Sequence, residues 1–248
     1  FRAIIKPFHR FMPAGFYYKT FIKQKVWSIV EDRLRSLSGF SKAPSETDED
    51  VYDHIFQHSE VLVIGGGAAG MAASLEILTN SKSSRVILVD ERENLGGELI
   101  NEFTTDKNAA LWYQETKDKL LEYKDEENPR LKILTSATAY AWYDHNYVEV
   151  LQTNATGQSM VYEGGQAARK VLHKIRTKEV ILATGAHERP MLFEGNDLAN
   201  IMLGQSVRRY LNEFNVVAGK EIILYGNNDS IYNTAIDLSE NNIKSKVI

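Results

Sequence analysis

The 248-residue chain is 43% hydrophobic and carries 29 Lys or Arg against 33 Asp or Glu, a net charge of −4. It contains no cysteine, which excludes disulfide frameworks, thiolate metal sites, thiol nucleophiles and redox-active cysteine pairs. No apolar run approaches the ~20 residues needed to cross a bilayer, and the first thirty residues lack the apolar core of a secretory signal. We therefore expect a cytoplasmic location.

The first 44 residues form a basic arm that is rich in aromatic residues. They hold nine Lys or Arg against Glu31 and Asp32, a net charge of +7, which leaves −11 for the rest of the chain. Basic residues interleaved with aromatic ones can bind nucleic acid by stacking on its bases. Because this positive excess is modest and dispersed among large apolar residues, packing against a partner or a neighbouring domain is favoured. We expect neither a nucleic acid nor a membrane partner.

A polar, acidic stretch, SKAPSETDEDVYDH, indicates a boundary, and we predict an acidic linker over residues 45–58. A dinucleotide-binding domain is then predicted over residues 59–217. It begins with the strand EVLVI, a glycine turn, a helix over residues 68–78 and a second strand over residues 85–90. Apolar strands separated by helices are typical of a parallel sheet covered on both faces. The predicted fold class is α/β, with a Rossmann-like FAD- or NAD(P)-binding domain.

The next segment, residues 106–125, has the pattern of an amphipathic helix that ends before Pro129. Short extended segments separated by turn residues then predict an inserted antiparallel β-meander at about residues 131–176. Residues 218–248 predict the start of a second, degenerate nucleotide-type βα unit. Since the chain begins on Phe1 rather than Met and ends on an apolar run, we expect a fragment with this last unit truncated.

The turn between the first strand and the first helix carries the pattern GxGxxG at Gly65, Gly67 and Gly70. The first glycine permits a tight turn, the second lets the backbone approach a pyrophosphate, and the third lets the helix pack closely on the sheet. The helix that starts at Ala68 and Ala69 offers unpaired N–H groups and a positive dipole end to a phosphate. Its place between a strand and a helix favours a bound dinucleotide over a ligand-free turn.

Asp90 lies 20 residues after Gly70, at the end of the second predicted strand. A carboxylate there accepts hydrogen bonds from the ribose hydroxyls of adenosine and disfavours the 2′-phosphate of NADP. Glu91 takes this role if the strand runs one residue further, and Arg92 is grouped with them as a predicted cofactor contact. The motif leaves FAD and NAD open.

Two further segments, ENLGGEL and EVILATGAHERP, resemble the equivalent segments of the two-dinucleotide flavoproteins, the family that includes the glutathione and thioredoxin reductases. In that family the Ala-Thr-Gly turn closes the first dinucleotide domain near the pyrophosphate. The absence of cysteine excludes the disulfide-reductase branch. The resemblance implies cofactor contacts at Gly96, Gly97, Ala183, Thr184 and Gly185.

Three longer segments resemble the α subunits of heterotetrameric sarcosine oxidases, and related α subunits of opine, hydroxyproline and hydrogen cyanide-forming amine dehydrogenases share the pattern. They are FMPAGFYYKTF (11–21), ATGAHERPMLFEGNDLANIML (183–203) and LYGNNDSIYNTAIDL (224–238). The resemblance implies NAD, or less favourably FAD, in this Rossmann domain. It also implies a β subunit that oxidises the amine at FAD, an FMN at the subunit boundary, γ and δ subunits, and a tetrahydrofolate-binding domain outside this sequence.

The reaction implied by this resemblance is oxidative demethylation of sarcosine to glycine. The one-carbon unit passes to tetrahydrofolate or leaves as formaldehyde, and oxygen becomes H2O2. On this interpretation the chain holds a cofactor and no catalytic residue. Three alternatives stay open: an opine, hydroxyproline or amine dehydrogenase α subunit, a stand-alone FAD-dependent NAD(P)H oxidoreductase without a cysteine pair, and a non-catalytic structural subunit.

A second strand–turn–helix segment, YGNNDSIY, keeps only Gly226 of the motif. Side chains at the later positions crowd an approaching pyrophosphate. Asn228, Asp229 or Ser230 is therefore predicted to cap the following helix, and a second dinucleotide is expected to bind poorly or not at all.

The segment AHERP places His187, Glu188 and Arg189 side by side, which allows acid and base roles. Adjacent residues point in different directions, however, so Arg189 is interpreted as a surface ion pair or, less favourably, a phosphate or flavin-edge contact. Of the six histidines, His54 and His58 lie four residues apart, in the predicted linker. We predict no metal site.

Overall fold

The computed structural model describes residues 46–47, 50–103, 106–124, 129–153, 160–161 and 167–248. Internal contacts divide the chain into residues 1–49 and residues 50–248, and the second unit is described here. The predicted basic arm and its FMPAGFYYKTF segment lie outside the described residues.

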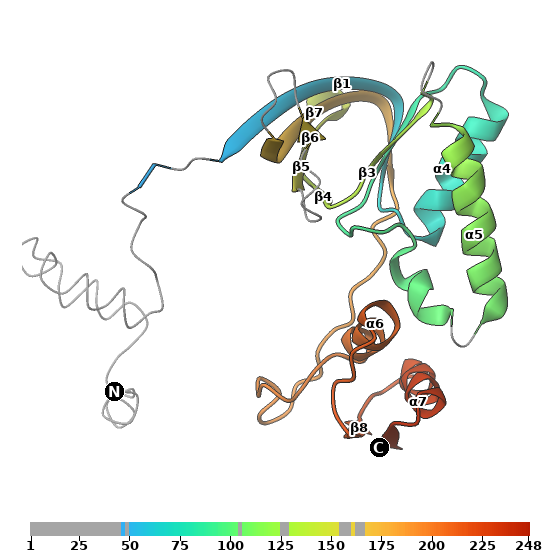
Figure 1. Ribbon diagram of the computed structural model, residues 1–248, viewed down its shortest axis with the longest axis vertical. Coiled ribbons are helices and arrows are strands. Elements are labelled where there is room, and N and C mark those ends of the chain that lie inside the picture. Colours follow the sequence, from blue (N-terminus) through green and yellow to red (C-terminus); the bar gives the residue numbers. More distant parts are fainter. Residues whose placement is uncertain (1–45, 48–49, 104–105, 125–128, 154–159, 162–166) are drawn as a thin grey trace, which may run out of the picture. The chain divides into compact units, whose positions relative to one another are not determined.

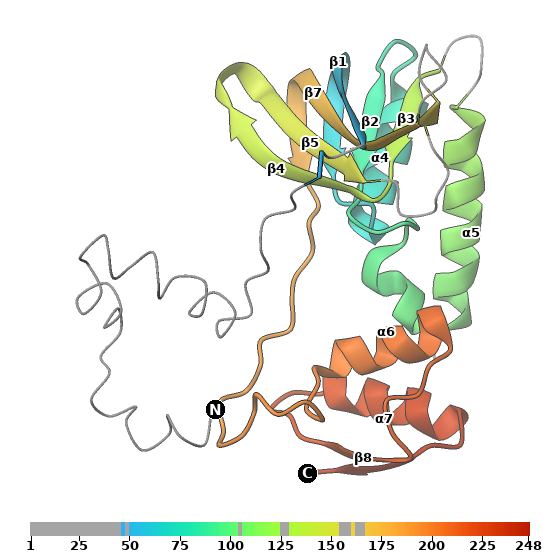
Figure 2. The same cartoon turned by 60° about the vertical axis from the view of Figure 1, so that its left-hand side comes forward.

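A mixed sheet organises the first part of this unit. Among the described residues it has seven strands in the order β3-β2-β1-β7-β5-β4, with β6 paired to β7 (Figures 1 and 2). Neighbours among β1, β2, β3 and β7 run parallel, whereas β4, β5 and β6 pair in antiparallel fashion. This confirms the predicted α/β class. The strands are β1 (Val51–Ile64), β2 (Val86–Val89), β3 (Leu131–Leu134), β4 (Ala137–Tyr143), β5 (Tyr147–Thr153), β6 (Met160–Val161) and β7 (Ala167–Leu182).

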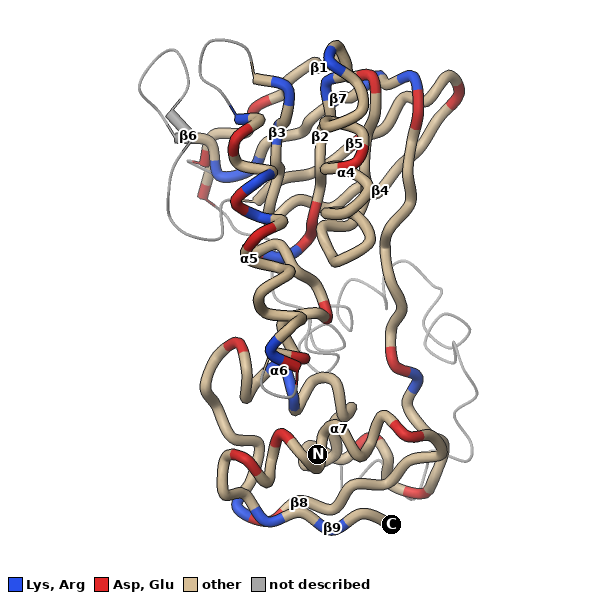
Figure 3. Tube along the Cα trace, turned by 90° about the vertical axis from the view of Figure 1, so that its right-hand side faces the viewer, with Lys and Arg blue, Asp and Glu red and all other residues tan. Residues whose placement is uncertain are grey.

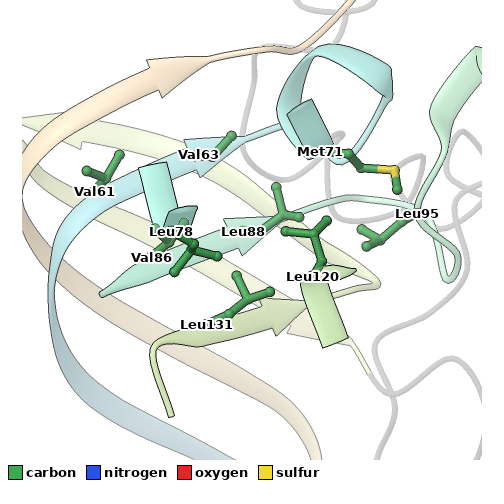
Figure 4. Packing of buried hydrophobic residues seen from close by; sticks show 9 residues of the cluster. All are labelled: Val61, Val63, Met71, Leu78, Val86, Leu88, Leu95, Leu120 and Leu131. Carbon is green, nitrogen blue, oxygen red and sulfur yellow. The ribbon is translucent and has the colours of Figure 1, made fainter. Parts of the chain in front are cut away.

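The two faces of the parallel strands are covered by different layers. Helices α4 (Ala68–Asn80) and α5 (Lys107–Glu122) lie side by side on one face, and charged residues are spread along α5 (Figures 1 and 3). On the other face, Leu62 and Val89 pack with Val148, Val150 and Ile175 of the meander. The burial of both faces explains why β1 and β2 end in continuous apolar runs. The helix-side core comprises Val61, Val63, Met71, Leu78, Val86, Leu88, Leu95, Leu120 and Leu131 (Figure 4).

Two predicted boundaries are wrong. Residues 51–58, assigned to the acidic linker, are the first part of β1, in which half-buried and exposed side chains alternate. Alternation with a period of two is typical of a strand, but the polar residues of this segment led to its assignment as a linker. Residues 131–134, assigned to the start of the meander, are the parallel strand β3 paired with β2. The antiparallel part begins at β4, and β7 belongs to both parts because it pairs with β1 and β5.

After β7 the chain forms a smaller βαβ unit. It comprises α6 (Gly204–Phe214), β8 (Glu221–Leu224), α7 (Ser230–Glu240) and β9 (Lys244–Val247), with β8 and β9 parallel. Its core is Val207, Leu211, Leu224 and Leu238. Strands β8 and β9 and helix α7 lie where the second nucleotide-type βα unit is predicted, whereas α6 lies in the segment assigned to the dinucleotide-binding domain. Among the described residues, no helix is both long and apolar enough to cross a membrane.

Candidate functional site

Three segments that are far apart in the sequence meet at the carboxyl end of β1. The turn after β1 donates from Gly65 N–H to Val89 O at 2.8 Å, and Gly96 N–H donates to Gly66 O at 2.8 Å. The segment after β7 joins through Ala183 N–H, which donates to Ile64 O at 2.7 Å. The glycine turn (residues 65–70), the Gly96–Gly97 pair and the Ala-Thr-Gly segment therefore lie together, as the resemblance to two-dinucleotide flavoproteins implies.

The three motif glycines are required for different reasons. Gly65 has a φ of +108°, and a Cβ there would lie 2.1 Å from Ala183 O. A Cβ on Gly70 would lie 1.8 Å from Gly65 O, so this glycine is needed for close packing of α4. Gly67 differs, because a Cβ there would meet only Gly97 Cα, at an ordinary 3.9 Å, and its φ of −72° suits any residue. Neither packing nor backbone conformation explains glycine at this position.

Helix α4 opens directly from Gly67, which is its N-cap and supplies no side-chain hydrogen bond. Ala68 and Ala69 are exposed at the first turn. The first N–H groups of an α-helix have no partner within the helix, and together with the helix dipole they favour an anion. Small residues therefore leave this helix end open to an incoming phosphate.

Asp90 has a structural role that sequence reasoning missed. Its side chain is 7% exposed. One oxygen accepts from Gly66 N–H at 2.5 Å and the other accepts from Arg92 N–H at 2.7 Å. Asp90 thus fixes the glycine turn against the loop after β2. The neighbouring Glu91 is the exposed carboxylate of this pair.

An open pocket of about 430 Å³ lies beside that loop. Its walls come from the loop after β2, from β4 and β5, and from α6. Arg92 on its rim is held by an ion pair with Glu98 and by its carbonyl, which accepts from Ser136 N–H at 2.8 Å. Two carboxylates, two guanidinium groups and three hydroxyls make the pocket polar. The lining residues are Glu91, Arg92, Glu93, Ser136, Thr138, Thr153 and Arg209.

The remaining predicted glycines sit in conformations that other residues rarely adopt. Gly96 and Gly97 have φ values of +118° and +54°, and a Cβ on Gly97 would lie 2.9 Å from Gly67 Cα. Gly185 has a φ of +71° with open space around it, and Thr184 is exposed. These residues shape the rim of the glycine turn.

The segment AHERP serves the fold through Glu188. Its carboxylate accepts from Gly204 N–H at 3.2 Å and from Gln205 N–H at 2.8 Å, so it caps the N-terminus of α6 from 16 residues upstream. His187 and Arg189 are exposed. Sequence spacing does not reveal this long-range cap, since local capping patterns extend only a few residues.

A buried arginine connects the segment after Gly97 to the smaller βαβ unit. Arg208 on α6 donates to Asp237 at 2.6 Å, to Glu102 at 2.8 Å and to the carbonyl of Asn101 at 2.7 Å. Burial lowers the pKa of Arg208, but its hydrogen bonds with Glu102 and Asp237 outweigh burial and raise the pKa overall. Asn101 and Glu102 end the short helix η2 (Gly97–Glu102). No local sequence pattern indicates this network, because its members lie up to 107 positions apart.

The second turn is built for packing. A Cβ on Gly226 would lie 2.2 Å from Ile231 Cγ2, so this glycine is required by the chain itself. Asn228 accepts from Ser230 N–H at 2.9 Å, which makes it the capping side chain among the three candidates. His54 and His58 lie in β1 rather than in a linker. Within the described residues, no three His, Asp or Glu gather as a metal site would require.

Residues 59–222 match the family model for pyridine nucleotide-disulphide oxidoreductases. The chain belongs to this family. The match covers more than half of the sequence and includes all three segments that meet at the glycine turn. These 248 residues contain no cysteine, so this part of the protein does not carry a redox disulfide of the kind in the family's name.

Curated relatives are more specific. The chain is 36% identical over 233 residues to the sarcosine oxidase α subunit of Rhizobium meliloti (strain 1021), covering 92% of this chain and 23% of that protein. It is 37% identical over 206 residues to the sarcosine oxidase α subunit of Corynebacterium sp. (strain P-1), covering 82% of this chain and 20% of that protein. The predicted resemblance is confirmed, and the chain spans about a fifth of the length of these relatives.

Two further matches are more distant. An opine oxidase subunit of Agrobacterium tumefaciens (strain Ach5) is 27% identical over 179 residues, covering 72% of this chain and 34% of that protein. The crystal structure of L-proline dehydrogenase from P. horikoshii superposes with a TM-score of 0.62 at 24% identity, covering 82% of this chain and 37% of that one. Family and relatives together support a dinucleotide-binding oxidoreductase subunit.

Proposed function

We propose that the chain is the dinucleotide-binding part of the α subunit of a sarcosine oxidase-like complex, with NAD, or less favourably FAD, at the glycine turn. The observation that carries this proposal is Gly67. Its neighbours Gly65 and Gly70 are glycine because the chain leaves no room for a side chain, whereas at Gly67 the chain leaves room. A glycine at a position where the fold has room for a side chain is explained by a pyrophosphate that lies close to the protein backbone.

The residues around Gly67 fit such a group. The open N-terminus of α4 presents N–H groups and a positive dipole end to a pyrophosphate. Asp90 and the exposed Glu91, which lines the polar pocket, are the two candidates to accept from adenosine ribose hydroxyls. Asp90 also accepts from the N–H groups of Gly66 and Arg92, and a carboxylate oxygen can accept more than one hydrogen bond, so Asp90 keeps this role beside its role in shaping the turn.

In this proposal the chain binds and orients a cofactor and supplies no catalytic side chain. A bound nicotinamide or flavin dinucleotide supplies hydride or electron transfer. Gly96, Gly97, Ala183, Thr184 and Gly185 are the further proposed contacts of this cofactor.

The resemblance to sarcosine oxidase α subunits extends the proposal to the rest of the complex. A β subunit oxidises the amine at FAD, an FMN lies at the boundary between subunits, and γ and δ subunits complete a cytoplasmic assembly. Tetrahydrofolate binding belongs to a part of the protein outside this sequence. Sarcosine is the proposed substrate, and the opine oxidase relatives make an opine the second candidate.

The test is to identify the nucleotide that heat releases from the purified full-length protein, by mass and absorbance, with and without its companion subunits. The proposal expects an adenine dinucleotide from the wild type and a loss of at least about tenfold in Gly67→Ala, because a methyl group blocks the approach of the pyrophosphate. Gly219→Ala is the matched control, since a Cβ there has ordinary room at 3.7 Å and Gly219 lies outside the turn.

Other results contradict the proposal in distinct ways. If no nucleotide is released, or if Gly67→Ala retains it fully, the glycine turn is not the binding site. If the protein without companions is yellow and oxidises NADH, a stand-alone flavin oxidoreductase is the correct interpretation. Assays of the complex with sarcosine and with opines then decide between the two substrates.

A further inference from the structure

The meander has a second face that points away from the core. We define the meander outer face by the residues of β1, β7, β5 and β4 that lie opposite the buried Val148, Val150 and Ile175. Strand register places these residues in two adjacent rows, except for Tyr140, which lies in the irregularity of β4 next to Ala141 and reaches Glu149 through a hydrogen bond. One row contains Phe56, Lys174, Glu149 and Tyr140, and the other contains His58, Arg176, Tyr147 and Tyr143.

Contacts within the rows confirm that these side chains share one face. Lys174 Nζ lies 5.2 Å from the centre of the Phe56 ring, and Arg176 Cζ lies 5.5 Å from that of Tyr147. The hydroxyl of Tyr140 donates to Glu149 at 2.8 Å, and that of Tyr147 donates to the same carboxylate at 3.1 Å. The face is therefore an ordered surface in which aromatic rings and cations are paired.

Its composition is unusual for a solvated sheet face. Phe56 is 71% exposed, Tyr140 54% and Tyr143 52%. Neighbouring large aromatic residues beside Arg are enriched where proteins bind one another and are uncommon as a purely solvated surface. Their rigid rings lose little conformational entropy on contact, so they are suited to anchor a partner.

The charge on this face is positive. Strand β7 carries four cations that are separated by multiples of two residues, so they lie on one side of the strand: Lys170, Lys174, Arg176 and Lys178. In the described part of the sheet, two carboxylates lie beside these four cations: Glu149, which accepts from the hydroxyls of Tyr140 and Tyr147, and Glu60 of β1, which lies 3.9 Å from Lys178 Nζ, so positive charge remains in excess. An occupant of this face therefore has to bring negative charge around an apolar centre.

We propose that the meander outer face docks an acidic, partly apolar surface of a companion subunit. The identity of the occupant as a companion subunit rests on the proposed function, whereas its chemistry follows from the face. The basic arm of this chain does not fit, because its net charge of +7 repels a positive face. A nucleic acid fits poorly, because a chain with a net charge of −4 and a pI of about 5.9 repels a polyanion at long range.

The experiment measures the affinity of the full-length protein for its separately purified companion subunits by biolayer interferometry. Two variants alter the face, Lys174→Glu in charge and Phe56→Ser in apolar contact. Two matched variants on α5, on the other side of the sheet, serve as controls: Lys119→Glu, and Leu111→Ser at a side chain that is 62% exposed. Nucleotide content and melting temperature are measured for each variant.

Each variant of the face is expected to weaken binding by about tenfold or more, because central anchors dominate interface energies, while the α5 controls stay within about twofold. Lys174→Glu is also expected to weaken the fall of affinity with added salt, since it replaces a charge that attracts an acidic partner by one that repels it. Nucleotide content stays at the wild-type level in all four variants.

Unchanged binding in both face variants overturns the inference, as does an absence of companion binding by the wild type. If the wild type binds a short fluorescein-labelled single-stranded RNA and Lys174→Glu does not, the occupant is a nucleic acid and the inference is also wrong. The proposed function fails separately: a protein that holds no nucleotide but loses its companion in the face variants refutes the cofactor and keeps the docking surface.

Discussion

Identical residues in the glycine turn perform unlike tasks. A side chain at Gly65 or Gly70 would clash with the chain itself, because its Cβ would lie 2.1 Å or 1.8 Å from a backbone oxygen. A Cβ at Gly67 would cause no such clash. Substitutions at these sites therefore separate folding from binding. A motif read from sequence treats the three positions alike, and only their surroundings divide them.

We predict that Gly70→Ala destabilises the fold, whereas Gly67→Ala does not. A methyl group added to Gly70 would lie 1.8 Å from Gly65 O, much closer than van der Waals contact allows. Forcing such a group into a packed site typically costs about 1–3 kcal/mol or more. Urea unfolding of both variants and of Gly219→Ala measures the difference. Equal stability of the Gly70 and Gly67 variants would contradict the division of roles.

A second prediction concerns His173, which is buried in the meander at 1% exposure. Its Nδ1 lies 2.5 Å from Gln57 Nε2, and its Nε2 lies 2.9 Å from Gln152 Oε1. With the glutamine amides in these orientations, Gln57 donates to Nδ1 and Nε2–H donates to Gln152, which fits one neutral tautomer. Burial first, and then the positive charge of Lys132, lower the pKa of His173 to about 4.

Because the ordinary pKa is 6.5, the unfolded chain binds a proton on this residue between pH 6.5 and 4 that the folded chain excludes. The stabilising effect is complete above pH 6.5 and is lost as the pH falls, by up to about 3 kcal/mol. Urea unfolding at pH 7 and pH 4.5 should show this loss in the wild type and in His58→Gln. In His173→Gln the loss should be smaller, and an equal loss there would assign it to other groups.

At the scale of elements, α6 is fixed by two long-range contacts. Glu188 caps its first turn, and Arg208 joins it to Asp237 on α7 and to the end of η2. Asp237 is fully buried, and one of its oxygens has no partner among the described residues. The Arg208 contact is thus the main compensation for a buried carboxylate.

We predict that Arg208→Met destabilises α6 and α7 by about 3–5 kcal/mol, because it leaves Asp237 buried without its cation. Arg208→Lys restores only part of this, since one ammonium does not reproduce three guanidinium contacts. Limited proteolysis of the segment after residue 203 and urea unfolding measure the effect. The double variant Arg208→Met with Asp237→Leu should recover stability, and its failure to do so would refute the buried-charge explanation.

The elements differ in how far sequence could predict them. The apolar runs of β1 and β2 and the periodicity of α5 led to correct element types, because burial on two faces or on one stripe leaves a local pattern. The first half of β1 was missed because its alternation includes Asp53, His54, Gln57 and His58. Strand β3 was assigned to the meander because four residues do not reveal whether their partner is parallel.

The site was predictable only where it depends on local geometry. Gly65, Gly70 and their neighbours follow from a turn that fixes its own backbone. Other contacts join residues that are far apart: 24 positions for Asp90 with Gly66, 16 for the capping by Glu188, and 107 for Arg208 with Asn101. The contact of Asp90 with Arg92 is local but depends on which way the carboxylate points. No spacing rule carries that information.

For the whole molecule, the contrast between the two βα turns leads to a last prediction. The space beside Gly226 is filled by Ile231, and the capping Asn228 follows it, whereas a Cβ on Gly67 would make only an ordinary contact with Gly97 Cα at 3.9 Å. We therefore expect the first turn, and not the second, to hold an adenine dinucleotide. In the full-length protein, Gly67→Ala should remove one adenine dinucleotide per chain, whereas Asn227→Ala, an exposed change in the second turn, should remove none.

Quantitative nucleotide release from each variant, normalised to protein concentration, measures this difference. A thermal shift supports it, because a ligand at one hundred times its dissociation constant adds about 2.7 kcal/mol to the stability of the folded state that binds it. Added NAD or FAD should then raise the melting temperature of Asn227→Ala and leave that of Gly67→Ala unchanged. A shift that disappears in Asn227→Ala instead would place the nucleotide in the smaller βαβ unit and reverse the assignment of the two turns.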